Sequence, residues 1–272
     1  MLKNIFKKIE SLPSLPQTIE KIEDFKKRND TEIQNLVEIL EQDALVVTTL
    51  LKIANSSLFG FKNRIETISR IINLLGINFV IYITISEAIN NILKTDLEPY
   101  DIKSEDFMTA STGALSLANL WLSKIDKELK EEMLLPSLLQ ETGKFVLSEL
   151  ILNKGLLEEF KKKIESGIEV TIAEKELLGI TTSQVTAEIF KYWNLSEDLI
   201  KTIEYVDDVN RSDEEYKFKA QILNVIKTVC DINSFLSDSS IKKALIKAKE
   251  YEMDIELLSD SIETLKRRLN DS

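Results

Sequence analysis

Residues 30–55, DTEIQNLVEILEQDALVVTTLLKIAN, have the pattern of two successive helices. Apolar side chains recur at the spacing of one helix face at Ile33, Leu36, Val37 and Leu40. Thr31 and Gln34 form a capping-box pattern before this run, and Asp43 can cap the helix that follows. A helix that ends where the next one is capped indicates a chain built from short, packed helices.

Helical signals of the same kind continue to the end of the chain. The chain holds only 7 Gly and 4 Pro, which is few for the tight turns that sheets require. Residues 79–94, FVIYITISEAINNILK, are dense in β-branched side chains, so a buried strand is an alternative there, but their length favours a buried helix. Two further capping-box patterns, Thr171 with Glu174 and Ser212 with Glu215, predict helix starts. We therefore predict an all-α protein of about a dozen helices.

Local composition divides the chain into three parts. The stretch from Thr95 to Ser104, which contains Pro99, is typical of a linker. It separates a predicted N-terminal helical half, residues 1–98, from a second helical half, residues 99–235. Residues 236–272 are predicted to form C-terminal amphipathic helices, and the last of these carries an apolar stripe at Leu258, Ile262, Leu265 and Leu269. The stripe can pack on the core or on another chain, and periodicity does not choose between them.

Charge and apolar patterning exclude several classes of function. The net charge of the 272-residue chain is −11, whereas duplex binding relies on basic side chains that neutralise phosphates. Nucleic acid is therefore not an expected partner. The most apolar stretch, residues 71–93, is broken by polar side chains, so we expect buried helices there and no membrane span. No secretory signal is expected, and the lone Cys230 cannot form an intramolecular disulfide, which fits the cytoplasm.

The chain contains no histidine. It therefore has no imidazole ligand for zinc or iron and no imidazole general base. A metal ion would need carboxylate and carbonyl oxygens, which suit magnesium, calcium or manganese. The sequence also has no G-x-S-x-G nucleophile motif, and it has neither a G-x-x-x-x-G-K-[ST] nor a G-x-G-x-x-G phosphate loop.

Residues 137–147, SLLQETGKFVL, place a polar pair inside a predicted apolar helix. Gln140 and Glu141 are expected to be buried there, and a buried carboxylate needs a partner or a shifted pKa. Lys144 lies three residues after Glu141 on the same predicted helix face, so an ion pair between them is geometrically easy. The residues alone favour an internal salt bridge that ties helices together, and a functional site is the alternative.

Two other polar segments have structural interpretations as well. In IANSSLFGFKN, residues 53–63, Asn55 and Ser56 can satisfy the last carbonyl groups of a helix, and a binding loop is the alternative. Residues 241–253, IKKALIKAKEYEM, carry Lys242, Lys243, Lys247 and Lys249. These lysines can attract a phosphate, but the favoured interpretation is a solvated helix face with Ile241, Leu245 and Ile246 turned inward.

Several segments together resemble one family, the HDOD domain of bacterial signalling proteins, which is related to the HD-type phosphohydrolases. LPSLPQTIEKI, residues 12–22, is similar to the family's opening L-P-x-L-P element. ILEQDALVVTTLLKIANSSLFG, residues 39–60, resembles the acidic-D-P-x-L…N-S-x-x-x-G signature, with Ala44 at the usual proline. TISRIINLLGINFV, residues 67–80, resembles the A-I-x-x-L-G segment that follows. The resemblance covers roughly residues 11–206 and implies an HD-domain-like bundle with an N-terminal helical subdomain.

The resemblance also implies that the metal-binding positions of catalytic relatives are replaced in this chain. Thr109 stands at the first histidine, Gln140-Glu141 at the His-Asp pair, Thr182 at a later histidine, and Val206-Asp207 at a final His-His pair, while Gly143 and Lys144 are retained. A two-metal phosphodiesterase needs histidines and aspartates to hold its metal ions and to activate water. We therefore predict no catalytic residue and no metal ligand. The predicted ligand-binding candidates of this degenerate pocket are Thr109, Gln140, Glu141, Lys144, Thr182 and Asp207.

Three functions are compatible with this resemblance. The favoured one is a non-enzymatic regulatory domain of signal transduction, which contacts a signalling protein and needs no cofactor. The second is a sensor of a nucleotide or cyclic dinucleotide, in which Lys144 would contact phosphate and Gln140 a base edge. The third is a residual phosphodiesterase in which Glu141 and Asp207 hold one hard cation.

Overall fold

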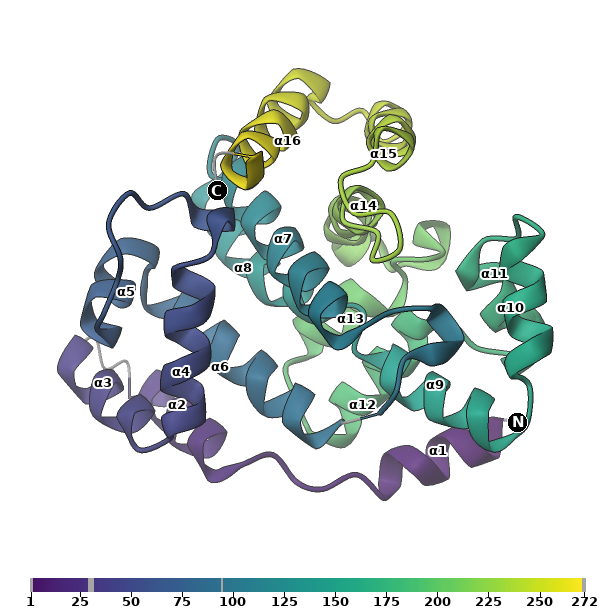
Figure 1. Ribbon diagram of the computed structural model, residues 1–272, viewed down its shortest axis with the longest axis horizontal. Coiled ribbons are helices and arrows are strands. Elements are labelled where there is room, and N and C mark those ends of the chain that lie inside the picture. The colour runs from purple at the N-terminus through teal and green to yellow at the C-terminus, as the bar shows by residue number, and fades with distance from the viewer. Residues whose placement is uncertain (1, 29–31, 94, 271–272) are drawn as a thin grey trace. The chain divides into compact units, whose positions relative to one another are not determined.

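The computed structural model of the chain describes residues 2–28, 32–93 and 95–270. Figure 1 shows these residues as helices joined by short connections, and no strand occurs among them. Residues 77–92 form one helix, so the strand alternative for that segment is wrong, and the all-α prediction is confirmed. Within the described ranges no single helix is both long and apolar enough to cross a membrane. The helices Ile68–Leu75 and Ile77–Ile92 together reach that length and apolarity, but the chain bends by 118° between them.

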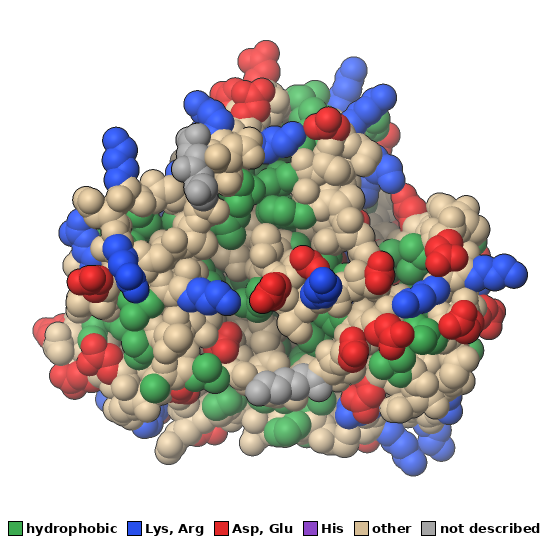
Figure 2. Space-filling view, in the orientation of Figure 1, with side chains coloured by type: hydrophobic (Ala, Val, Ile, Leu, Met, Phe, Trp, Pro, Cys, Tyr) green, Lys and Arg blue, Asp and Glu red, His purple; other side chains and the backbone are tan. Residues whose placement is uncertain are grey.

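The chain divides into two compact units, and each unit is assembled from two separate stretches of sequence. Unit 1 holds Met1–Leu12 and Leu93–Ile262, and unit 2 holds Pro13–Ile92 and Glu263–Ser272. The predicted division into residues 1–98, 99–235 and 236–272 follows the chain order, whereas the compact units do not. Acidic and basic side chains are interspersed on the face drawn in Figure 2, so the negative charge is not gathered into one patch there.

Unit 2 is built from short helices that follow one another closely. They are α2 (Gln17–Lys27), α3 (Ile33–Glu41), α4 (Ala44–Ala54), the 3₁₀ turn η1 (Ser57–Phe59), α5 (Ile68–Leu75) and α6 (Ile77–Ile92). The predicted N-cap of α4 is confirmed, because Asp43 Oδ1 accepts from the backbone N–H groups of Leu45 and Val46 at 3.0 and 3.2 Å. The predicted capping box at Thr31 falls on residues that lie outside the described ranges.

Asn55 ends α4 and ties it to the chain that follows. Its side-chain amide donates to the carbonyl oxygens of Leu51 and Ile65 at 2.8 Å, and its Oδ1 accepts from the N–H of Ile65 at 2.8 Å. Each of these bonds satisfies a backbone group at a helix end or a turn. The structural interpretation of this segment is therefore confirmed.

Unit 1 contains the remaining helices. They are α1 (Leu2–Glu10), η2 (Glu98–Tyr100), α7 (Ser104–Leu122), α8 (Lys127–Leu139), α9 (Gly143–Asn153), α10 (Leu157–Glu165), α11 (Val170–Leu178), α12 (Thr182–Tyr192), α13 (Glu197–Glu204), η3 (Val209–Arg211), α14 (Glu214–Val229) and α15 (Asp238–Glu250). Helix α16 (Ile255–Asn270) begins in unit 1 and ends in unit 2. Large apolar side chains such as Trp121, Phe160 and Phe190 are fully buried in unit 1.

Both capping boxes predicted in this part of the chain are wrong. Helix α11 begins at Val170, so Thr171 already lies inside it and Glu174 turns toward the interior. Helix α14 begins at Glu214 after Asp213, one residue beyond the position that a cap at Ser212 requires. A capping box that was not predicted from the sequence pairs Thr181 with Gln184 at the start of α12. In the first case the glutamate of the S/T-x-x-E pattern is a buried carboxylate. In the second case the helix begins one residue later than the pattern requires.

The C-terminal helices turn partly different faces inward from those predicted. In α15 the fully buried apolar positions are Ala244 and Ala248, and Ile246 is 51% exposed, so its predicted inward position is wrong. In α16 three of the four stripe residues, Leu258, Ile262 and Leu265, are buried within this chain, and Leu269 is half-buried. The chain itself therefore covers most of the stripe.

Candidate functional site

Gln140 and Glu141 lie at a helix junction and not inside a helix. Helix α8 ends at Leu139 and α9 begins at Gly143, so the polar pair occupies the turn between them. The two helices break there because Gly143 brings α9 against α12. A Cβ at position 143 would lie 2.3 Å from the carbonyl oxygen of Thr182, and the Gly143 N–H donates to Thr186 Oγ1 at 2.8 Å. Only glycine permits this approach, and the approach places Glu141 and Lys144 beside the start of α12.

Five charged side chains meet in the interior of unit 1, and we call them the charged cluster. They are Glu141, Lys144, Glu174, Asp207 and Lys227. They come from the α8–α9 junction, from α9, α11 and α14, and from the turn after α13. None of these five side chains is more than 16% exposed. Charges buried to this degree persist only when they are paired.

Lys227 bridges two of the carboxylates. Its ammonium lies 2.7 Å from Asp207 Oδ1 and 3.2 Å from Glu141 Oε1. Burial alone would lower the pKa of Lys227, but Asp207 and Glu141 outweigh it and raise the pKa well above its usual range. The lysine is therefore charged at neutral pH. Its ammonium lies between two carboxylates and neutralises part of their charge.

Lys144 makes the ion pair with Glu141 that its spacing predicts. Its ammonium lies 3.0 Å from Glu141 Oε2 and 3.8 Å from Glu174 Oε1. It also lies 4.4 Å from the ring centroid of Tyr100 on η2, which adds a cation–π contact. Burial alone would raise the pKa of Glu141, but Lys144 and Lys227 outweigh it and the pKa is lowered. Glu141 is therefore ionised and shared between two lysines.

Glu174 is the most deeply buried member of the charged cluster. Its side chain is 0% exposed, and it accepts hydrogen bonds from Tyr100 Oη at 3.0 Å, from the Thr182 N–H at 2.7 Å and from Thr182 Oγ1 at 2.6 Å. Burial raises the pKa of Glu174, and Lys144 lowers it only in part. Burial also raises the pKa of Tyr100, with the nearby Glu174 as the second cause. Through its bonds to Thr182, Glu174 anchors α11 to the start of α12.

Four of the six predicted candidates meet at the charged cluster. Glu141, Lys144 and Asp207 are members, and Thr182 is bonded to Glu174. Gln140 lies beside them, where its Nε2 donates to the carbonyl oxygen of Ser137 at 3.3 Å.

Thr109 does not join the cluster. It is exposed on α7, and its hydroxyl donates back to the carbonyl oxygen of Glu105 at 2.8 Å.

Two charged members of the cluster, Glu174 and Lys227, are absent from the sequence-based candidates. Glu174 matched a capping-box pattern, which gave its carboxylate an alternative explanation. Lys227 lies between Ile226 and Val229, both fully buried, and a lysine within such an apolar run is the signal that could have identified it. Neither residue belongs to the motifs that carry the family resemblance.

The space beside Gln140 and Glu141 is small. It is lined by α7 residues that include Ser111, by Gln140 and Glu141, and by Lys227, and its volume is about 10 Å³. This volume corresponds to roughly one water molecule. A nucleotide does not fit there, because the side chains of the charged cluster fill the region.

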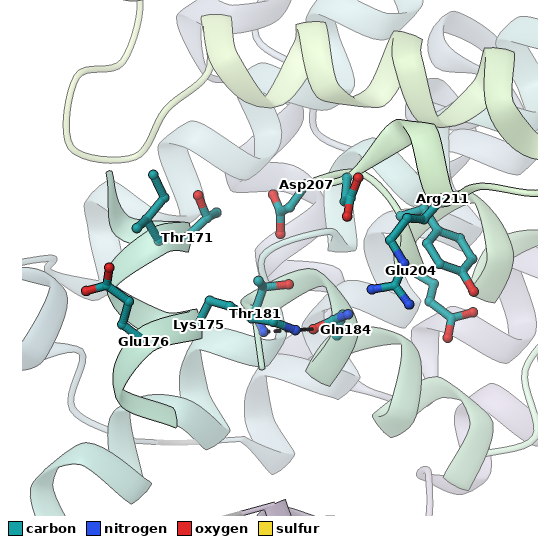
Figure 3. A pocket seen from close by; sticks show the side chains of 11 residues that line it. Thr171, Lys175, Glu176, Thr181, Gln184, Glu204, Asp207 and Arg211 are labelled. Atoms are coloured by element: carbon teal, nitrogen blue, oxygen red, sulfur yellow. Dashed lines mark hydrogen bonds between the residues drawn. The ribbon is translucent and has the colours of Figure 1, made fainter. Parts of the chain in front are cut away.

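A larger cleft lies on the other side of Asp207, and we call it the α11–α13 cleft. Its volume is about 280 Å³. Side chains of α11, α12, the end of α13 and η3 line it, and Figure 3 shows Lys175, Gln184 and Arg211 close together among them. Asp207 lines this cleft and is also a member of the charged cluster, where its Oδ1 contacts Lys227 and its Oδ2 accepts from Ser183 Oγ.

The charged cluster does not fit a two-metal phosphohydrolase centre. The chain has no imidazole, and within residues 2–28, 32–93 and 95–270 no group of three or more His, Cys, Asp or Glu side chains is arranged to hold a metal ion. The carboxylates that remain are occupied by lysine ammonium groups. A metal ion at Glu141 and Asp207 would have to displace Lys227.

The helical architecture has counterparts in known proteins. The HDOD domain family matches residues 12–209 of this chain. The chain belongs to the HDOD domain family. A curated, uncharacterized protein of Treponema pallidum (strain Nichols) is 25% identical over 215 residues, which is 79% of this chain and 41% of that protein. This HDOD chain thus spans less than half the length of the curated relative that it matches.

Solved structures show the same HDOD architecture. A virulence factor of Campylobacter jejuni is similar at a TM-score of 0.58 and 25% identity, over 99% of this chain and 100% of that one. An HDOD domain protein of unknown function from Geobacter sulfurreducens is similar at a TM-score of 0.73 and 18% identity, over 98% of this chain and 95% of that one. At this level of identity the second likeness supports the fold alone. The prediction of an HD-domain-like helical bundle is confirmed.

Proposed function

We propose that this chain is a non-catalytic regulatory member of the HDOD family, and that it acts in signal transduction by contacting another protein. The observation that carries the proposal is the position of Lys227. Its ammonium lies between Glu141 and Asp207, the two carboxylates of the positions at which the family resemblance places metal ligands. An internal cation neutralises these carboxylates without offering a coordination site for water or substrate.

The remaining residues of the cluster support the same conclusion. A hydrolase of this type needs a base that takes a proton from water near neutral pH. The pKa of Glu141 and that of Asp207 are lowered, because the lysines outweigh the effect of burial. Both carboxylates are therefore weak bases that are engaged in ion pairs. Glu174 has a raised pKa, but it is completely buried and its oxygens accept three hydrogen bonds.

A turnover assay tests the non-catalytic part of the proposal. The purified chain is incubated with a cyclic dinucleotide and with a chromogenic phosphodiester, each in the presence of magnesium or manganese. Glu141→Gln and Asp207→Asn serve as matched variants, since each removes one charge at nearly constant shape. We expect turnover of the wild type to equal that of both variants and of a blank without protein. Metal-dependent turnover that falls in either folded variant would contradict the proposal and would support a residual carboxylate–metal phosphodiesterase.

The regulatory part of the proposal needs a partner, and a second experiment addresses it. Tagged protein is purified from the source cells under native conditions, and the co-purifying protein is identified by mass spectrometry. The complex is then reconstituted from the two purified components and its stoichiometry is measured by light scattering. We expect a defined complex that survives in the Glu141→Gln background. A chain that elutes alone in both steps would argue against a role through protein contacts.

A further inference from the structure

Some charged side chains that line the α11–α13 cleft have no ion-pair partner among the described residues. Three of its four carboxylates are already paired with lysines. Glu176 contacts Lys163 at 2.7 Å, and Asp207 contacts Lys227 at 2.7 Å. Glu204 is paired with lysines of α12 and α13 at 3.1 and 3.5 Å. Of the acidic side chains that line the cleft, only Asp208 makes no ion pair with another described residue.

Two basic side chains of the cleft also make no ion pair with another described residue. Lys175 on α11 and Arg211 on η3 both line it, and neither makes an ion pair within the part of the chain that the structure describes. Lys175 donates instead to Gln184 Oε1 at 3.4 Å, and Gln184 is itself held by the N–H of Thr181 at 3.1 Å. In Figure 3 the charged ends of Lys175 and Arg211 lie on either side of Gln184. The unpaired charge of the cleft is thus two positive against one negative.

The chemistry of this lining selects a class of ligand. A lysine and an arginine that face one space are suited to a phosphate group, because the guanidinium forms paired hydrogen bonds and the ammonium adds a point charge. The carboxylate of Asp208 can accept hydrogen bonds from hydroxyl or amino groups of the same ligand. Ile172, which is 47% exposed, and the ring of Tyr205 add apolar surface.

The volume of the cleft limits the size of that ligand. At about 280 Å³ the cleft lies near the lower end of the range of roughly 300–1,000 Å³ that is usual for small-molecule sites. A ligand with one ring system and one phosphate is of suitable size, whereas a cyclic dinucleotide is too large to be enclosed.

We propose that the α11–α13 cleft binds a small organic monophosphate, with Lys175 and Arg211 holding the phosphate and Asp208 accepting hydrogen bonds from the rest of the ligand. This inference goes beyond the regulatory role, since it assigns a ligand site that lies beside the charged cluster and shares only Asp207 with it. It also links the two regions, because Asp207 lines the cleft and pairs with Lys227 at the same time. A ligand in the cleft is therefore in contact with a residue that holds α14.

Isothermal titration calorimetry of the full chain tests the proposal. The probes are inorganic phosphate, ribose phosphate, AMP and adenosine, each raised to millimolar concentration. We expect AMP or ribose phosphate to bind more tightly than inorganic phosphate, and adenosine to give no measurable heat of binding. The difference between AMP and ribose phosphate shows whether a base or only a sugar contributes.

Variants separate a specific site from general attraction of anions. Lys175→Ala and Arg211→Ala are each expected to weaken binding of the preferred phosphate by about tenfold or more, since each removes one charged hydrogen-bond donor. Lys249→Ala is the matched control, because Lys249 is an exposed lysine of α15 that does not line the cleft. All three substitutions are at exposed positions, and the thermal unfolding midpoint confirms that each variant is folded.

Two results would overturn the proposal. One is that none of the three phosphates binds at millimolar concentration. The other is binding that Lys175→Ala and Arg211→Ala leave as strong as Lys249→Ala does. Chromatography of the recovered AMP keeps this test distinct from the proposed function. Cleavage of AMP would contradict the non-catalytic role and leave the binding site standing, whereas intact AMP without binding would remove only the site.

Discussion

The ammonium of Lys227 lies 2.7 Å from Asp207 Oδ1, although the two residues come from different elements, α14 and the turn after α13. Both side chains are almost completely buried. Within unit 1 the pair therefore ties α14 to the turn after α13. Its removal has consequences that can be measured.

Replacing Lys227 with methionine is expected to destabilise the chain by about 3–5 kcal/mol, because it leaves Glu141 and Asp207 buried without their shared cation. The control is Lys217→Met on the same helix, whose partner Glu214 has a side chain that is 83% exposed. An exposed pair of this kind contributes at most about 1 kcal/mol. Urea unfolding of both variants measures the difference. Equal, small losses in the two variants would show that Lys227 does not neutralise the buried carboxylates.

The charged cluster also predicts how stability responds to acid. The pKa of Asp207 is lowered, because Lys227 outweighs the effect of burial, and that of Glu141 is lowered for the same reason. A carboxyl with a lowered pKa in the folded state stabilises the fold above its unfolded pKa of about 4, and this contribution is lost as the pH falls through the folded pKa. We therefore expect the free energy of unfolding to fall as the pH drops below about 4. In Asp207→Asn this fall should be shallower, as measured by urea unfolding at a series of pH values. An unchanged slope would contradict the predicted pairing.

Glu174 affects the pH dependence of the free energy of unfolding in the opposite direction. Burial raises its pKa in the folded state, so the folded chain retains a proton that the unfolded chain releases. Its contribution to stability therefore decreases as the pH rises above about 4. Between pH about 4 and neutral pH, the free energy of unfolding should decrease less in Glu174→Gln than in the wild type. An equal decrease in the two proteins would contradict the raised pKa and would show that the lysines hold Glu174 ionised.

The contrast between Asp43 and Glu174 shows what could be predicted from sequence. Asp43 caps α4 as expected, because a cap depends only on neighbours within three residues. The S/T-x-x-E pattern around Glu174 is equally local, but its carboxylate is instead used by Tyr100 and Thr182, which belong to other elements. Helix periodicity and the family motifs therefore predict the architecture, while they miss contacts such as those of Glu174, which join α11 to η2 and to the start of α12.

Only those residues of the site that lie at the positions of the family motifs could be predicted from the sequence. The i,i+3 spacing predicts the ion pair of Glu141 and Lys144, and the structure contains it. Lys227 comes from a helix outside the matched residues 12–209, so no motif comparison could include it. The resemblance places Thr109 in the pocket, whereas Thr109 lies at an exposed position of α7 and its hydroxyl bonds within that helix.

Cys230 offers a reporter of unfolding that needs no substitution. It is the only cysteine of the chain, it is 5% exposed, and burial raises the pKa of its thiol well above the usual range. A protonated, buried thiol reacts slowly, because the thiolate is the nucleophile. We expect no modification by a thiol reagent at pH about 8 in the folded chain, and stoichiometric modification in urea. Rapid reaction under native conditions would show that the end of α14 opens readily.

Gly143 connects the fold to the site, and its replacement is the sharpest test of that connection. A Cβ at this position would lie 2.3 Å from the Thr182 carbonyl oxygen and 2.9 Å from the Thr186 backbone nitrogen. These atoms belong to the backbone of α12, so they cannot move aside as a side chain does. We expect Gly143→Ala to destabilise the chain by about 1–3 kcal/mol or more.

The matched comparison for Gly143→Ala is Gly113→Ala on α7. A Cβ at Gly113 would meet the ring of Phe235 at 2.4 Å, and that contact is with a side chain that can rotate. The higher helix propensity of alanine, about 1 kcal/mol, offsets part of the cost at Gly113. Urea unfolding of both variants should therefore show a clearly larger loss for Gly143→Ala. An equal loss would mean that α12 adjusts to the added methyl group, and that the glycine is not what sets the distance between Glu141 and α12.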